Sequence, residues 1–189
     1  MQGSPAPNVN TYISTTDKRS SSGIIDGTGN LTNARVYLYS GTEDTTVKRP
    51  VMNALNSYYS HYITQSSNIV YETNIQSAHT QPTIDPNMNK CSVSASPYIS
   101  YCDYDGAGIA LQHIYQSLNP RNNGTAMGKM LEFDQSEFLS DPTSKSLATT
   151  GYVYVPNTCA SNISCVVCVT KNNKNWCYTQ ASPNDFHFL

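Results

Sequence analysis

The 189-residue sequence has few charged residues and no long apolar run. Asp, Glu, Lys and Arg together make up only 13% of the chain, and the formal net charge is −2. A nucleic-acid-binding domain usually carries a basic patch, which this balance does not favour. No apolar stretch approaches the roughly 18 residues of a transmembrane helix. We therefore expect neither a nucleic acid nor a membrane as a partner, and the length suits one domain or slightly more.

The polarity comes instead from uncharged side chains. Ser, Thr and Asn contribute 61 residues, and the aromatic residues are mainly 14 tyrosines, against four Phe and one Trp. Disordered chains have few aromatic residues and a high net charge. The composition therefore predicts a folded domain.

Six cysteines and three Asn-X-Ser/Thr sequons, at Asn30, Asn123 and Asn162, indicate an oxidising, secretory setting. The first residues do not match that setting, because MQGSPAPNVN has neither the basic nor the apolar region of a signal peptide. Either the chain is cytosolic or Met1 is not its natural beginning.

Cofactor-binding motifs are missing from the sequence. The spacings Cys159-X5-Cys165 and Cys165-X2-Cys168 have no second matching pair, so we expect no metal site. The glycines at 23–29 lack the lysine and the preceding strand of a phosphate-binding loop, and we expect no cofactor.

Hydrophobic periodicity predicts an alternation of strands and helices, which is typical of an α/β fold. Residues 1–34 are polar and predict a loop or a loosely held arm. Apolar residues spaced three to four apart predict helices at 47–63 and 105–118. We expect strands at 35–40, 69–71, 130–133, 152–155 and 165–169.

Two loops after predicted strands carry titratable groups. Asp44 lies in GTEDTT, after the strand at 35–40, and His79 lies in SAHTQP, after the strand at 69–71. Functional groups of open α/β sheets lie beyond the carboxyl ends of the strands. An acid and a histidine there suit a hydrolase, in which the carboxylate orients the histidine that acts as general base.

More ordinary roles are also open for these side chains. Asp44 could accept backbone N–H groups at the start of the next helix, and His79 could be an unremarkable loop residue. The remaining histidines are weaker candidates. His61 and His113 fall within predicted helices, as surface or packing residues, and His187 lies near the C-terminus.

Several segments resemble the extracellular poly(3-hydroxybutyrate) depolymerases. SGTEDTTV (40–47), AHTQPT (78–83) and CSVSASPYISYCDYDGAG (91–108) carry the resemblance, and the last of these is the most distinctive. LQHIYQSLNPRN, LEFDQSEF and TGYVYVPNTCA continue it in the same order. The resemblance covers about residues 17–166 of the chain.

This resemblance implies a secreted serine esterase with a circularly permuted α/β-hydrolase fold. It implies a partial catalytic domain at 35–169, preceded by the polar arm at 1–34 and followed by a divergent tail at 170–189. The chain would then hold a partial α/β-hydrolase-like sheet with helices.

The resemblance also assigns individual residues. It makes Asp44 the acid, with Glu43 as the weaker alternative, and His79 the base. It implies two disulfides, Cys91 with Cys102 and Cys159 with Cys165. Cys168 and Cys177 have no counterpart in the family.

The family's nucleophile is missing from the sequence. In the family a serine precedes the Asp in a Gly-rich elbow, but no Gly-X-Ser-X-Gly occurs here. Ser20–Ser22 with Gly23 is only a superficial match, because no apolar strand precedes it and no helical pattern follows. The His-Gly-Cys turn that supplies an oxyanion N–H is also missing after 165–169.

Two hypotheses follow. In the first, the chain is an inactive fragment or truncated form of an extracellular enzyme that hydrolyses a short-chain polyester or related ester. In the second, it is a non-catalytic module that binds a polymer or another surface through its tyrosines, especially those between Pro97 and Tyr104. The oligomeric state stays open in both.

Overall fold

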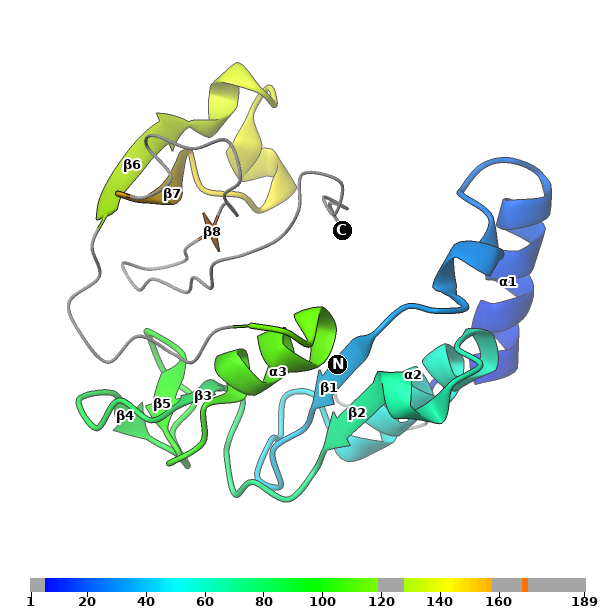
Figure 1. The fold of residues 1–189 in the computed structure, drawn as a ribbon, viewed down its shortest axis with the longest axis horizontal. Helices are drawn as coiled ribbons and strands as arrows, with labels where there is room; N and C mark the ends of the chain where they lie inside the picture. Colours follow the sequence, from blue (N-terminus) through cyan, green and yellow to red (C-terminus); the bar gives the residue numbers. More distant parts are fainter. Residues whose placement is uncertain (1–5, 119–127, 158–167, 170–189) are drawn as a thin grey trace. The chain divides into compact units, whose positions relative to one another are not determined.

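The computed structural model describes residues 6–118, 128–157 and 168–169. The chain divides into two compact units, Met1–Gln116 and Ser117–Leu189 (Figure 1). Helices and small sheets occur together, which confirms the predicted α/β class. Among the described residues, no helix combines the length and the hydrophobicity needed to cross a bilayer.

Two short parallel sheets lie in the first unit. Strand β1 (Val36–Tyr39) pairs with β2 (Ile69–Glu72), in the register Val36↔Ile69. In the second sheet, β5 (Ile99–Tyr101) lies between β3 (Gln81–Thr83) and β4 (Asn89–Lys90). The buried apolar side chains of the first unit include Leu38, Tyr62, Ile63, Ala78 and Ile99.

Helix α2 (Arg49–Tyr62) connects β1 to β2 and forms a βαβ unit with them. Pro50 lies in its first turn, where the missing N–H costs no helical hydrogen bond. Helix α3 (Gly106–Tyr115) begins after Asp105, whose carboxylate accepts the N–H of Gly108 at 3.1 Å. The helices predicted at 47–63 and 105–118 are therefore present, each slightly shorter than expected.

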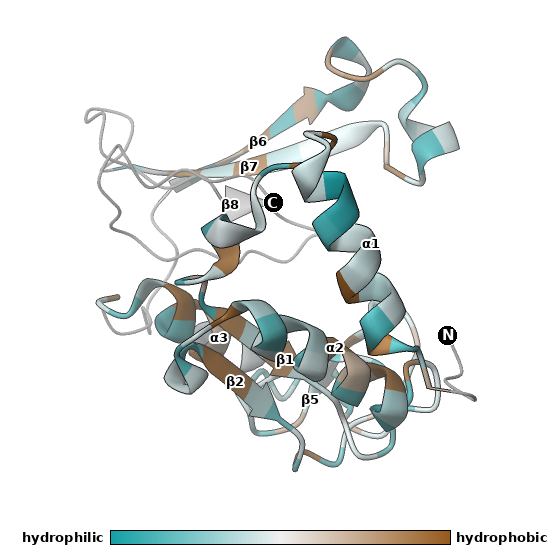
Figure 2. Cartoon of the chain, turned by 90° about the vertical axis from the view of Figure 1, so that its right-hand side faces the viewer, coloured by the Kyte–Doolittle hydropathy of each residue, from teal (hydrophilic) through white to brown (hydrophobic). Residues whose placement is uncertain are grey.

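The loop predicted for residues 1–34 is wrong in part. Val9–Ser21 forms helix α1, and the turn η1 (Thr28–Leu31) follows it. The Asn8 side chain caps α1 by accepting the N–H of Thr11, and basic residues in the last turn suit the helix dipole. No residue of α1 is buried, and Figure 2 colours this helix mainly in hydrophilic shades. The sequence of α1 therefore lacks the apolar stripe by which a helix is predicted.

Tyrosines attach α1 to α2. The Tyr62 hydroxyl donates to the Asp17 carboxylate at 2.9 Å, and the hydroxyls of Thr16 and Tyr58 lie 2.8 Å apart. Burial and the bond to Asp17 raise the pKa of Tyr62 to about 12, so its hydroxyl remains a donor at neutral pH. The turn η2 (Ser66–Asn68) then leads from α2 into β2.

The second unit contains an antiparallel sheet. Strand β6 (Gly128–Asp134) pairs with β7 (Thr150–Pro156), and β8 (Cys168–Val169) pairs with β7 as well. The turns η3 (Gln135–Glu137) and η4 (Pro142–Lys145) lie between β6 and β7. These strands match those predicted at 130–133 and 152–155, and the last one in its final two residues.

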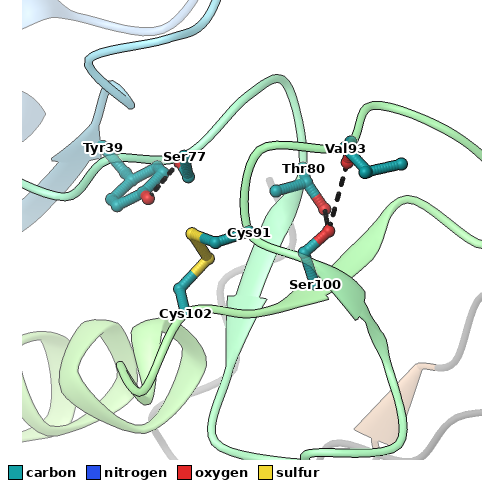
Figure 3. The surroundings of a disulfide bond; sticks show 7 residues. All are labelled: Tyr39, Ser77, Thr80, Cys91, Val93, Ser100 and Cys102. Atoms are coloured by element: carbon teal, nitrogen blue, oxygen red, sulfur yellow. Dashed lines mark hydrogen bonds between the residues drawn. A yellow bond between two sulfur atoms is a disulfide. The ribbon is translucent and has the colours of Figure 1, made fainter.

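A disulfide joins Cys91 to Cys102, as the family resemblance implies, across a sequence separation of 11 residues (Figure 3). The carbonyl of Cys91 accepts the N–H of Ala78 at 3.0 Å, and the N–H of Cys102 donates to Thr83 at 3.0 Å. The disulfide is thus attached to the chain on both sides of His79. The second implied pair, Cys159 with Cys165, lies outside the described residues.

We expect a variant with both Cys91→Ser and Cys102→Ser to lose about 2–3 kcal/mol in the free energy of unfolding, because the unfolded chain gains conformational freedom. Chemical denaturation measures this difference. Ser92→Ala, an exposed change in the same loop, is the matched control and should leave the free energy unchanged. Equal stabilities of the double variant and the wild type would contradict the expectation.

Candidate functional site

The loop after β1 and the loop after β2 run side by side. The N–H of Thr42 donates to the carbonyl of Ile75 at 2.9 Å, and the N–H of Glu43 donates to that of Ser77 at 3.1 Å. Parallel pairing of β1 with β2 sends both loops from the same edge of the sheet. These hydrogen bonds then continue the contact beyond the strands.

Asp44 and His79 meet where these loops meet. His79 Nδ1 lies 2.9 Å from Asp44 Oδ2. The other carboxylate oxygen, Oδ1, accepts the N–H groups of Thr46 at 2.9 Å and Val47 at 2.8 Å. Backbone donors therefore fix the carboxylate, and its second oxygen faces the imidazole.

The two side chains differ in exposure. The Asp44 side chain is 11% exposed, whereas that of His79 is 46% exposed. An imidazole that donates from Nδ1 to a carboxylate has the tautomer in which Nε2 is free to accept a proton. The arrangement can thus present a basic nitrogen to a molecule arriving from solvent.

Glu43, the weaker alternative for the acid, is exposed and does not contact the imidazole through any hydrogen bond of the described residues. The alternative role, in which Asp44 caps the start of the next helix, is only partly present. Asp44 accepts backbone N–H groups, but these belong to the loop, and α2 has Lys48 at its N-cap without a side-chain cap.

The other histidines lie elsewhere. His113 Nε2 lies 2.9 Å from the carbonyl oxygen of Asn68, which connects α3 to the start of β2. His61 is exposed on α2 and makes an edge contact with the Tyr62 ring. His187 lies outside the described residues. Unlike His79, neither His61 nor His113 forms an ion pair with a carboxylate among the described residues.

The serines near the N-terminus have structural partners. The hydroxyls of Ser21 and Ser22 donate to the carbonyl of Lys18, and Ser20 Oγ accepts the N–H of Thr28 at 3.2 Å. These bonds lie at the C-terminal end of α1. Near the site, the Ser94 hydroxyl donates to the backbone carbonyl of His79 at 3.1 Å. Within the described segments, no serine hydroxyl is hydrogen-bonded to the His79 ring.

Two tyrosines of β1 whose hydroxyls are hydrogen-bonded in this unit are not identified from the sequence alone. Tyr39 Oη lies 2.5 Å from Ser77 Oγ, and Tyr37 Oη lies 2.7 Å from Tyr104 Oη. The alternation of Tyr37 and Tyr39 around the buried Leu38 places both on one face of β1, which is the only signal in the sequence that could have pointed to them.

Other predicted sites have mixed placements. Of the three sequons, Asn30 lies exposed in η1, and Asn123 and Asn162 lie outside the described residues. No group of three or more His, Cys, Asp or Glu side chains that could hold a metal ion occurs among the residues that the structure describes.

Comparison with known proteins identifies several relatives. The chain is 46% identical over 152 residues to a poly(3-hydroxybutyrate) depolymerase of Delftia acidovorans, covering 80% of this chain and 30% of the relative. It is also 46% identical over 140 residues to a polyhydroxybutyrate depolymerase of Talaromyces funiculosus, covering 72% of this chain and 40% of the relative. No family model matches the sequence.

Two solved structures are also similar to this chain. The crystal structure of PHB depolymerase from Penicillium funiculosum matches with a TM-score of 0.73 and 42% identity, over 82% of this chain and 48% of that one. A PHB depolymerase with a Ser-to-Ala substitution, complexed with an R3HB trimer, matches equally well. The chain therefore spans less than half the length of each of these relatives.

We expect Gly41→Ala to weaken the contact between the two loops. A Cβ at Gly41 would overlap the carbonyl oxygen and the hydroxyl of Ser77, so the backbone must move. Such overpacking costs about 1–3 kcal/mol of the free energy of unfolding. Gly29→Ala is the matched control, because a Cβ there meets no atom within 4 Å.

Chemical denaturation of both variants checks this expectation. The free energy of unfolding should fall in Gly41→Ala, and in Gly29→Ala it should be unchanged or fall by less than about a third as much. Equal losses in the two variants would show that the close approach of Gly41 to Ser77 is not what matters.

Proposed function

The chain belongs to the polyhydroxybutyrate depolymerase family, and we propose that Asp44 and His79 are the acid and the base of its ester-hydrolysing site. The observation that carries the proposal is the 2.9 Å contact between His79 Nδ1 and Asp44 Oδ2, with the imidazole still half exposed. This is the geometry that a general base and its orienting carboxylate require.

The proposed chemistry is acyl transfer through a serine nucleophile. His79 Nε2 takes the proton of the serine hydroxyl as its oxygen attacks the ester carbonyl, and Asp44 stabilises the imidazolium that forms. His79 then gives this proton to the departing alkoxide oxygen, which leaves as an alcohol. In the second half-reaction His79 takes a proton from water, whose oxygen attacks the acyl-enzyme, and returns it to the serine.

The fixed carboxylate supports this assignment. Two backbone N–H groups hold Asp44 Oδ1, so the side chain cannot rotate without losing both hydrogen bonds. A carboxylate held in this way fixes the tautomer of the imidazole before a substrate arrives. Fixed dipoles and charges of this kind need little rearrangement during the reaction.

We propose that the serine nucleophile is not among the residues of this chain. The sequence has no nucleophile-elbow motif. The hydroxyls of Ser20–Ser22, the superficial match, and of Ser94, which is bonded to the His79 backbone, take part in hydrogen bonds to backbone groups. The chain alone should then hydrolyse esters at a negligible rate.

The proposed substrate is an ester of a short 3-hydroxy acid, in a polyester or an oligomer. The names of the relatives, and the R3HB trimer in one of the similar structures, support this choice. The Cys91–Cys102 disulfide is typical of proteins from oxidising compartments and supports an extracellular location.

Exposed tyrosines favour a second candidate, a polymer-binding module without catalysis. Tyr98 is 53% exposed and Tyr101 is 40% exposed, both within the tyrosine-rich segment at 97–104. Aromatic rings on a surface can adsorb to an apolar polymer. Tyr104 does not share this exposure, because its hydroxyl is hydrogen-bonded to Tyr37.

An activity assay tests the main proposal. We expect this chain to show no hydrolysis of 4-nitrophenyl butyrate above background and no labelling by a fluorophosphonate probe. We expect activity when residues 36–116 replace the matching segment of the Talaromyces enzyme. In that chimera, Asp44→Asn and His79→Ala should each lower kcat by about 10⁴-fold.

The matched control in the chimera is His61→Ala, an exposed histidine on α2 that should leave kcat unchanged. An active chimera that retains its kcat after His79→Ala would overturn the assignment. Probe-sensitive hydrolysis by this chain alone would instead show that a nucleophile is present in it.

The binding candidate is tested with poly(3-hydroxybutyrate) granules. If it is right, the chain sediments with the granules without degrading them, and Tyr98→Ala with Tyr101→Ala lowers the bound fraction several-fold. Tyr12→Ala is the matched control, because Tyr12 is 57% exposed but lies on α1. An unchanged bound fraction in the double variant would contradict this candidate.

A further inference from the structure

A hydrogen bond between side chains joins the end of β1 to the loop that carries His79. Tyr39 Oη lies 2.5 Å from Ser77 Oγ, and Figure 3 shows the tyrosine hydroxyl directed at the serine. Tyr39 is the last residue of β1, and Ser77 lies two residues before His79. The bond therefore connects the strand that leads to Asp44 with the loop that carries His79.

Ser77 is fixed on several sides. It is fully buried, its N–H donates to Ile75 at 2.9 Å, and its carbonyl accepts the N–H of Glu43 at 3.1 Å. Gly41 packs so closely against it that a side chain there would overlap it. A shift of Ser77 would consequently move Glu43 and Asp44 on one loop and His79 on the other.

Tyr39 is held just as firmly. Its ring stacks on that of Tyr104, with the centroids 6.1 Å apart and 25° between the planes. Burial raises the pKa of Tyr39, and the nearby Tyr104, Glu72 and Asp44 raise it further against the lowering effect of Ser77. The Tyr39 hydroxyl therefore keeps its proton at neutral pH.

We propose that Tyr39 and Ser77 are a positioning pair that holds the His79 imidazole in register with the Asp44 carboxylate. The inference rests on the proposed function only for the catalytic role of His79 and Asp44, and not for the contacts that hold them. Neither residue is assigned a contact with substrate. Their effect is exerted through the backbone of the two loops.

A separate set of bonds holds the chain on the other side of His79. Thr80 Oγ1 lies 2.8 Å from Ser100 Oγ (Figure 3), and the Ser94 hydroxyl donates to the His79 carbonyl at 3.1 Å. The first bond anchors Thr80, the residue after His79, to β5, and the second anchors His79 to the loop between β4 and β5. On the Ser77 side, the loop is held by the side-chain bond to Tyr39 and by the backbone bonds of Ser77 with Glu43 and of Ala78 with Cys91.

The test uses the 189-residue chain and the ring proton on His79 Nδ1, observed by NMR with ¹⁵N-labelled histidine. We expect a proton signal protected from exchange in the wild type and its loss in Asp44→Asn, which assigns it. In Tyr39→Phe and in Ser77→Ala the exchange rate should rise about tenfold, the scale of losing one hydrogen bond. The double variant should match the single ones, because either change removes the same bond.

Tyr37→Phe is the matched control. It also removes a hydroxyl-to-hydroxyl bond of a partly buried tyrosine on β1, but that bond ends on Tyr104 and not on the His79 loop. We expect its exchange rate to stay within twofold of the wild type, even where its free energy of unfolding falls as far as that of Tyr39→Phe. A general loss of stability would move both variants alike.

Two results would overturn the positioning role. The first is an unchanged exchange rate in either Tyr39→Phe or Ser77→Ala, and the second is an equal rise in Tyr37→Phe. If Tyr39→Phe does not fold, Ser77→Ala and Ser77→Cys decide the question alone. None of these measurements uses ester hydrolysis, so failure of the positioning role and failure of the assigned catalytic roles are separate outcomes.

Discussion

The close approach of Gly41 to Ser77 is the constraint on which the arrangement of the site depends. With no Cβ at Gly41, the loop after β1 lies against the loop after β2 closely enough for Glu43 to bond to Ser77. Asp44 and His79 follow these contacts by one and two residues. A larger residue at 41 would separate the loops before either functional side chain was reached.

Asp44 combines two roles that appear as alternatives in the sequence. One oxygen closes a local turn by accepting N–H groups of Thr46 and Val47, and the other is bonded to His79. A carboxylate has enough lone pairs for both. The local turn therefore does not compete with the proposed relay, and it supplies the rigidity that an orienting acid needs.

Much of this arrangement was predictable from the sequence, for identifiable reasons. Apolar spacing gave α2 and α3, and strand topology placed Asp44 and His79 at one edge of a sheet. Helix α1 was missed because it contacts α2 through Asp17 and other polar groups rather than through an apolar stripe. The Tyr39–Ser77 bond was missed because it joins residues 38 positions apart that carry no motif.

Contacts within the protein hold Asp44 and His79 in place, so their geometry need not depend on a bound substrate. Asp44 is fixed by its own turn, the upstream side of His79 by Ser77, and the downstream side by Thr80 and Ser94. All of these bonds lie within the first unit, which also contains the Cys91–Cys102 disulfide. Contacts within the βαβ unit and its adjoining sheet thus orient the His79 imidazole toward solvent, bonded to the Asp44 carboxylate. A nucleophile from another part of an enzyme would then meet the proposed base already in position.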